Sequence, residues 1–196
     1  MTGTGDRLLG LVLAGGRSRR MGKDKAALKL DGKTALERGV ELLNAHCDEV
    51  FVSVRHDDTD ALRARFKTIA DQNGGIGPAD GIASAMACVP QAAWLVVACD
   101  LPKLDAATLK TLIEQRHHNA DATAFASGRD ALPEPLCTVY ESRALSSIQQ
   151  FINDDLRCPR KMLLNMNTHL LPPADNDALA NANTPDDWQA LAGVTL

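Results

Sequence analysis

Two uninterrupted apolar runs constrain this chain most, because each has the length of one strand and each stops at residues that end strands. Leu8–Ala14 is followed by Gly15-Gly16, and Trp94–Cys99 is followed by Asp100. Such runs fit strands that are buried on both faces, as in a parallel sheet covered by helices on both sides. We therefore expect both runs to lie in the interior of one sheet.

Helical and strand patterns alternate along the rest of the chain. Thr34 can cap a helix whose apolar residues, Leu36 and Val40 among them, recur at helical spacing. Further strands are expected at Val50–Val54, Lys67–Ala70 and Pro133–Tyr140, and further helices at Asp57–Phe66, Gly81–Val89 and Ser142–Asn153 and after the capping residues Asp105 and Thr184. This alternation predicts a three-layer α/β fold of the Rossmann-like kind, a mainly parallel sheet with helices on both faces.

Two segments depart from the alternation. Pro133–Tyr140 is expected to be an antiparallel strand at a sheet edge, because proline donates no ladder hydrogen bond. Arg157–Lys161 is rich in basic residues and is expected to be a solvated loop, with a basic patch for an anionic substrate as the alternative. The chain has no internal repeat and no interdomain linker, so residues 1–196 are expected to form a single domain.

The composition excludes several classes of protein. Hydrophobic residues make up 45% of the chain and charged residues 23%, as in an ordinary globular protein. No apolar run reaches the roughly 18 residues of a membrane span, and Met1–Asp6 lacks the features of a secretory signal. A net charge of −4 argues against nucleic-acid binding. We expect a cytoplasmic protein, because the five scattered cysteines suggest neither disulfides nor a zinc site.

A basic segment with two glycines follows the first apolar run. Gly15-Gly16 allows backbone N–H groups to approach phosphate oxygens, and Arg17–Lys25 holds five basic residues and one acidic residue. Open α/β sheets bind ligands at this position, beyond the carboxyl end of a strand. The spacing is neither that of a P-loop nor that of the dinucleotide-binding fingerprint. The segment indicates a phosphate-binding loop, with a solvated basic turn as the alternative.

The segment from Leu13 to Lys25, LAGGRSRRMGKDK, resembles the signature LAGG-x-S-x-RMG-x-DK of the molybdenum cofactor guanylyltransferase family. The resemblance implies a nucleotidyltransferase fold over nearly the whole chain. It also implies that Arg20 and Lys25 bind the triphosphate of GTP and act in catalysis. Nucleotide contacts are implied for Leu13, Ala14 and Gly15, through main-chain atoms, and for Gly16.

A second segment, Asp71 followed by the GPxxG element Gly77-Pro78-x-x-Gly81, reads on its own as a turn before a helix. In the family that this chain resembles, an aspartate and a GPxxG element wall the guanine pocket. A carboxylate can accept hydrogen bonds from guanine N1 and the exocyclic amine, so selection of a purine is chemically reasonable. Ser53 stands where the family can have asparagine, and we include it among the GTP-binding residues.

Asp100 ends the second apolar run, within the sequence Cys99-Asp100-Leu101-Pro102. Magnesium needs only one or two carboxylates when phosphate and water oxygens complete its shell. A capping aspartate is the alternative from the local pattern alone. Because CDxP is the family's metal-binding motif, the resemblance implies that Asp100 binds Mg²⁺ and contacts GTP. Cys99 is expected to be a core residue.

Two further elements are implied to face the active site, one with asparagines that lie at the metal or at the second substrate, and one with prolines that faces the second substrate. The family has N-x-NTP where this chain has Asn181 and Asn183, and Pro133-Glu-Pro135-Leu resembles the element that faces the pterin. The resemblance thus implies transfer of GMP from GTP to molybdopterin, with or without molybdenum bound, and release of pyrophosphate. Delivery proteins and molybdoenzymes are the protein partners that it suggests.

Three alternatives stay open from the sequence. A related enzyme would use CTP to make the cytosine dinucleotide, or would transfer a nucleotide to another small phosphate such as a sugar phosphate. A nucleotide-binding protein without turnover would serve cofactor delivery. Loss of Lys25 or Asp100 would be the mark of that last alternative, and both residues are present.

Overall fold

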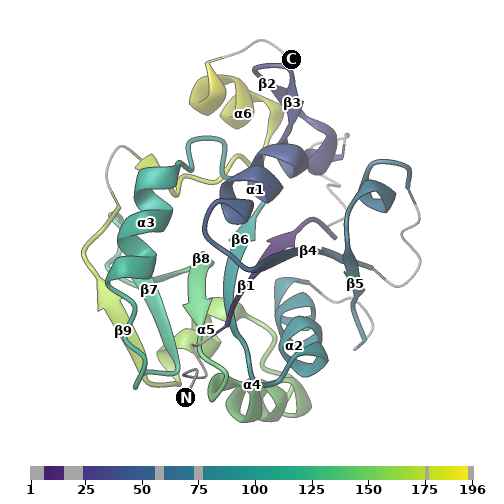
Figure 1. Ribbon diagram of the computed structural model, residues 1–196. Coiled ribbons are helices and arrows are strands. Elements are labelled where there is room, and N and C mark those ends of the chain that lie inside the picture. The colour runs from purple at the N-terminus through teal and green to yellow at the C-terminus, as the bar shows by residue number, and fades with distance from the viewer. Residues whose placement is uncertain (1–6, 16–23, 56–59, 73–76, 175–176, 194–196) are drawn as a thin grey trace.

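The computed structural model describes residues 7–15, 24–55, 60–72, 77–174 and 177–193 (Figure 1). Its centre is a seven-stranded sheet with the order β5-β4-β1-β6-β8-β7-β9. The strands of this sheet are β1 (Leu8–Leu13), β4 (Glu49–Val54), β5 (Thr68–Ala70), β6 (Ala93–Ala98), β7 (Ala122–Ala126), β8 (Pro133–Tyr140) and β9 (Thr168–Leu171). A separate antiparallel pair consists of β2 (Lys29–Leu30) and β3 (Lys33–Thr34).

Helices cover both faces of the sheet, as expected. They are α1 (Ala35–Asn44), α2 (Pro78–Cys88), α3 (Ala106–Glu114), α4 (Ala144–Asn153), α5 (Pro159–Leu164) and α6 (Pro185–Ala192), with short 3-10 helices η1 (Lys25–Ala27) and η2 (Arg63–Arg65). Thr34 caps α1 and Thr184 caps α6, each through a capping box, and Asp105 caps α3. None of the helices in the described part of the chain is long and apolar enough to cross a membrane.

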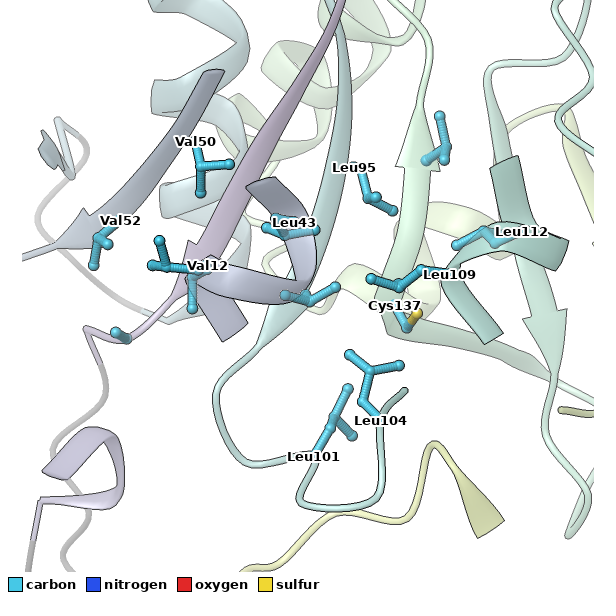
Figure 2. Close-up of a cluster of buried hydrophobic side chains, with 14 of the residues drawn as sticks. Val12, Leu43, Val50, Val52, Leu95, Leu101, Leu104, Leu109, Leu112 and Cys137 are labelled. Carbon is cyan, nitrogen blue, oxygen red and sulfur yellow. The ribbon is translucent and has the colours of Figure 1, made fainter. Parts of the chain in front are cut away.

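The two apolar runs form the centre of the sheet. β1 and β6 pair in parallel, and every residue of both strands is buried. Alternate side chains of β1 enter different cores: Val12 packs on the α1 and α3 side, which Figure 2 shows, and Leu11 packs on the α2 and α4 side. Gly10 allows α1 to approach closely, since a Cβ there would lie 3.1 Å from Leu43.

β8 is antiparallel to both of its neighbours, β6 and β7, as predicted, but the prediction that it lies at an edge is wrong. Its prolines are compatible with an interior strand because they occupy its first residues only. Pairing with β6 uses Cys137 to Tyr140, beyond both prolines. The register with β7 shifts between Ala124 and Ala126, opposite the proline-containing start.

The helix predicted over Asp57–Phe66 is also wrong in its described part, which holds only the 3-10 helix η2; residues 57–59 lie outside the described residues. The Asp60 carboxylate accepts hydrogen bonds from the N–H groups of Leu62 and Arg63, both at 2.9 Å. These bonds cap a single turn at its start and do not extend it into a longer helix. Arg63 is also only 4% exposed, whereas an amphipathic surface helix would present it to solvent.

Candidate active site

The carboxyl ends of three parallel strands meet at one edge of the sheet. β1 lies between β4 and β6, with Leu13 in register with Ser53 on one side and Ala98 on the other. A hydrogen bond from the Cys99 N–H to the Leu13 carbonyl (3.3 Å) continues this pairing past the strands. Asp100 therefore emerges beside the end of β1, where the predicted phosphate loop begins.

Lys25 holds together the polar contacts at this edge. Its Nζ donates to Oδ2 of Asp100 over 2.9 Å and to Oδ1 of Asn183 over 3.1 Å. The Lys25 and Asp100 side chains are only 18% and 16% exposed. Asp24 caps η1, which starts at Lys25, by accepting from the N–H of Ala26 (3.1 Å). Three predicted site residues from distant parts of the sequence thus converge.

The segment before α6 is fixed to the end of β6. The Ala182 N–H donates to the Asp100 carbonyl over 2.9 Å. Oδ2 of Asp187 accepts from the N–H groups of Asn183 (3.0 Å) and Thr184 (2.9 Å), so the capping box of α6 also holds the backbone of Asn183. Packing of α6 against β2 and β3 (Figure 1) therefore determines where the Asn183 amide lies relative to Lys25.

Asp100 has one carboxylate oxygen with no hydrogen-bond partner among the described residues. Oδ2 accepts from Lys25, whereas Oδ1 is buried and unpartnered. A buried, unsatisfied carboxylate oxygen is costly, so its retention calls for an explanation such as a ligand. The described residues contain no cluster of three or more His, Cys, Asp or Glu that could hold a metal. A magnesium ion that takes most of its oxygens from phosphate and water fits this single carboxylate.

Ser53 and Asp71 form a buried pair beneath the GPxxG element. The Ser53 hydroxyl donates to Oδ1 of Asp71 over 3.0 Å, and the two residues are 3% and 5% exposed. Burial raises the pKa of the Asp71 carboxyl, and the hydrogen bond from Ser53 opposes that shift. Gly81 packs so closely that a Cβ there would lie 2.4 Å from the Ser53 Oγ. Gly77 caps α2 at a φ of 105° and Pro78 is the first residue of the helix, so the element fixes both the start and the packing of α2.

Arg63 is a residue of this region that the sequence analysis did not identify. Its Nε and Nη2 donate to the Ala14 carbonyl (3.1 and 2.5 Å), and its Nη1 and Nη2 donate to Asp24 (2.7 and 3.0 Å). It also pairs with Asp60. Burial alone would lower the pKa of the Arg63 guanidinium, but the bonds to Asp24 and Asp60 raise it, so the group is charged. Nothing in the local sequence pattern distinguishes Arg63 from an exposed helical arginine.

An ion pair between a buried aspartate and a partly exposed arginine lies at the start of α2. Asp80 is fully buried, and its Oδ1 accepts from Nη1 of Arg157 over 2.9 Å. Arg157 also pairs with Asp155. The predicted solvated loop Arg157–Lys161 is therefore wrong in two respects, since Arg157 serves a buried carboxylate and α5 starts at Pro159. The charge of Asp80 further raises the pKa of Asp71, after the larger effect of burial.

The remaining predicted residues are placed as follows. Pro133 and Pro135 start β8, and because β8 runs antiparallel to β6 its start lies at the same edge as Asp100. Asn181 is exposed in the segment that leads to Asn183. Gly16 and Arg20 lie outside the described residues. Cys99 is partly buried and packs against the hydrophobic core, and burial raises the pKa of its thiol to about 12.

A family model described as the MobA-like NTP transferase domain matches residues 10–169. The chain belongs to this family. The match extends from β1 into β9 and includes Lys25, Asp71, Asp100 and the start of β8. It confirms the resemblance that the first loop suggested, and Asn181 and Asn183 lie beyond its end.

Relatives of known name agree with this assignment. The chain is 33% identical over 186 residues to a probable molybdenum cofactor guanylyltransferase from Synechococcus elongatus, covering 92% of this chain and 96% of the relative. It is 35% identical to a molybdenum cofactor biosynthesis bifunctional protein from Synechocystis, of which it spans only 52%. The crystal structure of molybdopterin-guanine dinucleotide biosynthesis protein A from Archaeoglobus fulgidus superposes with a TM-score of 0.78 at 26% identity, covering 94% of this chain and 97% of that one. The predicted nucleotidyltransferase fold is therefore confirmed.

Proposed function

We propose that this chain is one nucleotidyltransferase domain that transfers GMP from GTP to the terminal phosphate of molybdopterin, with or without molybdenum, and releases pyrophosphate. The observation that carries the proposal is the convergence of Lys25, Asp100 and Asn183 at the carboxyl edge of β1 and β6. Ligands bind at this edge in open α/β sheets. The names of the relatives support guanine as the base and molybdopterin as the acceptor.

The chemistry needs charge stabilisation and alignment more than it needs covalent catalysis. The main chain at Leu13, Ala14 and Gly15 would hold the nucleotide beside Lys25. The pterin phosphate is already ionised at neutral pH, so its attack on the α-phosphorus needs no general base. As the bond to the pyrophosphate breaks, the Lys25 ammonium would stabilise the charge that develops on the leaving oxygens. Asp100 and Asn183 hold that ammonium in place.

We propose Asp100 as the ligand of Mg²⁺. The buried, unpartnered Oδ1 supports this assignment, because a cation there would satisfy it. When bound to Asp100, Mg²⁺ would neutralise part of the charge of the phosphates. Gly16 and Arg20 remain proposed triphosphate contacts on the strength of the family motif alone.

The base and the second substrate would lie on either side of this centre. Ser53, Asp71 and the GPxxG residues form the proposed guanine side, supported by their tight packing against the end of β1. The start of β8 at Pro133 and Pro135 and the segment with Asn181 and Asn183 form the proposed pterin side. Delivery proteins and molybdoenzymes would receive the product. Five cysteines without disulfides agree with the reducing cytoplasm.

Pyrophosphate release with Mg²⁺ and in vitro-generated molybdopterin, measured with GTP and with CTP, tests the proposal. We expect release with GTP and its loss in Asp100→Ala. Asp154→Asn is the control, because Asp154 is an exposed residue after α4 that contacts Gln150. Release with CTP alone would assign the chain to cytidylyl transfer, and nucleotide binding without release would indicate a binding protein.

A further inference from the structure

One guanidinium joins the two ends of the proposed phosphate loop. Arg63 bonds to the Ala14 carbonyl, where β1 ends, and to both carboxylate oxygens of Asp24, which directly precedes Lys25. These contacts span 49 and 39 positions of sequence, and the Arg63 side chain is only 5% exposed. The start and the end of the loop are therefore fixed to a single buried group.

The bonds to the Ala14 carbonyl determine where the next amide points. The peptide between Ala14 and Gly15 is planar and trans, so its C=O and N–H point in opposite directions. With the C=O directed at Arg63, the Gly15 N–H is directed away from it. A backbone N–H at this position is the kind of group that contacts a nucleotide in the proposed function.

The bonds to Asp24 determine where Lys25 starts. Asp24 caps η1 through the Ala26 N–H, so a fixed Asp24 carboxylate fixes the first turn of η1 and with it the Lys25 backbone. A guanidinium is a planar fork that can serve the carbonyl and the carboxylate together. A lysine ammonium carries the same charge but lacks this geometry.

Charge gives a second reason for an arginine at this position. The carboxylates of Asp24 and Asp60 both pair with Arg63, whereas Asp100 pairs with Lys25. Without Arg63, Asp24 would be an uncompensated anion next to Lys25. It would then compete for the ammonium and repel the polyphosphate of an incoming nucleotide.

We propose that Arg63 is a positioning residue for nucleotide transfer, acting through the Gly15 amide and Lys25. The proposal rests on the proposed function, in that a nucleoside triphosphate is the ligand. Arg63 contacts the protein, and the groups that it positions, the Gly15 amide and Lys25, belong to the proposed nucleotide side. Its removal should therefore weaken nucleotide binding without affecting the acceptor substrate. A residue that served stability alone would show no such selectivity.

The test compares Arg63→Lys with Arg116→Lys. Arg116 is a matched control, because it forms a bidentate pair with Glu141 (2.5 and 2.6 Å) in which both side chains are 6% exposed. Glu141 follows Tyr140, which is in register with Trp94 at the start of β6, so this pair lies at the opposite edge of the sheet. Each substitution keeps the charge and removes the fork.

Isothermal titration calorimetry with GTP and Mg²⁺ and the thermal midpoint are measured for both variants. We expect Arg63→Lys to raise the dissociation constant by about ten-fold or more, the scale of residues that orient ligand-binding groups. We also expect a parallel rise in the KM for GTP with the KM for molybdopterin unchanged. Arg116→Lys should lower the thermal midpoint of unfolding, and it should leave the dissociation constant of GTP and the KM for GTP within about two-fold of wild type.

Wild-type GTP affinity in a folded Arg63→Lys variant would overturn the proposal. If that variant does not fold, Asp24→Asn and Asp60→Asn replace it, since they alter the two acidic partners of the same guanidinium. Asp24→Asn should weaken GTP binding and Asp60→Asn should not, and equal effects would overturn the proposal. Binding of CTP in place of GTP would refute the guanylyl assignment only, because the same comparison then applies with CTP. Failure of wild type to bind either nucleotide would refute both.

Discussion

Two ion pairs, one at the carboxyl end and one at the amino end of the central strand β6, differ in how many of their carboxylate oxygens accept hydrogen bonds. Arg116 and Glu141 are 6% exposed, and both oxygens of Glu141 accept hydrogen bonds from the guanidinium. Lys25 and Asp100 are more exposed, and one oxygen of Asp100 is buried without a hydrogen-bond partner among the residues that the structure describes. The first pair is complete as it stands and stabilises the fold. The second is incomplete without a ligand, which is why we place the chemistry at this edge.

The position of each pair in the sheet agrees with this difference. Glu141 follows the end of β8, next to the start of β6, whereas Asp100 follows the end of β6. Ligands of open α/β sheets bind beyond the carboxyl ends of the parallel strands, so only the second pair is on the binding edge. The following substitutions test whether the Arg116–Glu141 pair serves stability and the Lys25–Asp100 pair serves activity.

Glu141→Ala should have the largest effect, and it should be on stability alone. The substitution removes both hydrogen bonds that Glu141 accepts from Arg116, and breaking a buried ion pair in this way costs about 3–5 kcal/mol. The free energy of unfolding from urea titration measures this loss. The rate of pyrophosphate release per folded molecule should remain that of wild type, and a large fall in that rate would contradict the division between the edges.

Lys25→Gln should instead lower activity and leave stability nearly unchanged. Loss of a group that stabilises developing charge lowers turnover by about 10²–10³-fold. Steady-state pyrophosphate release measures this change, and Glu141→Gln serves as a control that keeps the shape of a buried side chain. Turnover within a few-fold of wild type in Lys25→Gln would show that the ammonium only holds Asp100 in place.

Gly81→Ala should disturb the proposed guanine side. The new methyl group would meet the Ser53 Oγ, and overpacking of this kind costs about 1–3 kcal/mol. Urea titration gives the loss of stability, and the KM for GTP should rise with it. Ser53→Ala in the same chain should recover part of the loss because it removes the clashing oxygen; strict additivity of the two substitutions would argue against that contact.

Asp71→Asn should have the smallest effect, and it should raise the free energy of unfolding where the other substitutions lower stability or activity. Burial raises the pKa of the Asp71 carboxyl above its unfolded value. The carboxyl therefore starts to destabilise the fold as the pH rises past its unfolded pKa, and does so fully above its folded pKa. The variant should therefore be more stable than wild type at neutral pH. The difference should vanish below a pH of about 3.9, the ordinary pKa of aspartate. The free energies of unfolding of the variant and of wild type, measured from neutral pH to below a pH of about 3.9, check this prediction. A variant less stable than wild type at neutral pH would refute it.

The sequence predicts those parts of the fold that are determined locally. β1 and β6 are recognisable because burial on both faces leaves no polar residue in them. The interior position of β8 depends on pairing with β6 and β7, which the prolines in its own sequence do not reveal. β9 and α5 are short, at 4 and 6 residues, and carry too few residues for a clear period.

The candidate site divides in the same way. Lys25 and Asp100 belong to motifs, so the resemblance indicates both, but their contact of 2.9 Å forms only in the folded chain, where β6 pairs with β1. Arg63 belongs to no such motif. Its importance lies in bonds to Ala14 and Asp24 that form only in the folded chain, and an arginine in a charged segment is ordinarily exposed.

The most direct test of the account is the dissociation constant of GTP with and without Mg²⁺, in wild type and in Asp100→Asn. If the unpartnered Asp100 oxygen receives the cation, Mg²⁺ should tighten GTP binding in wild type, and most of that tightening should be lost in the variant. Asparagine keeps an oxygen that can accept from Lys25, so the lysine contact is retained. The same Mg²⁺ dependence in both proteins would contradict the account, because Asp100 would then be only the partner of Lys25.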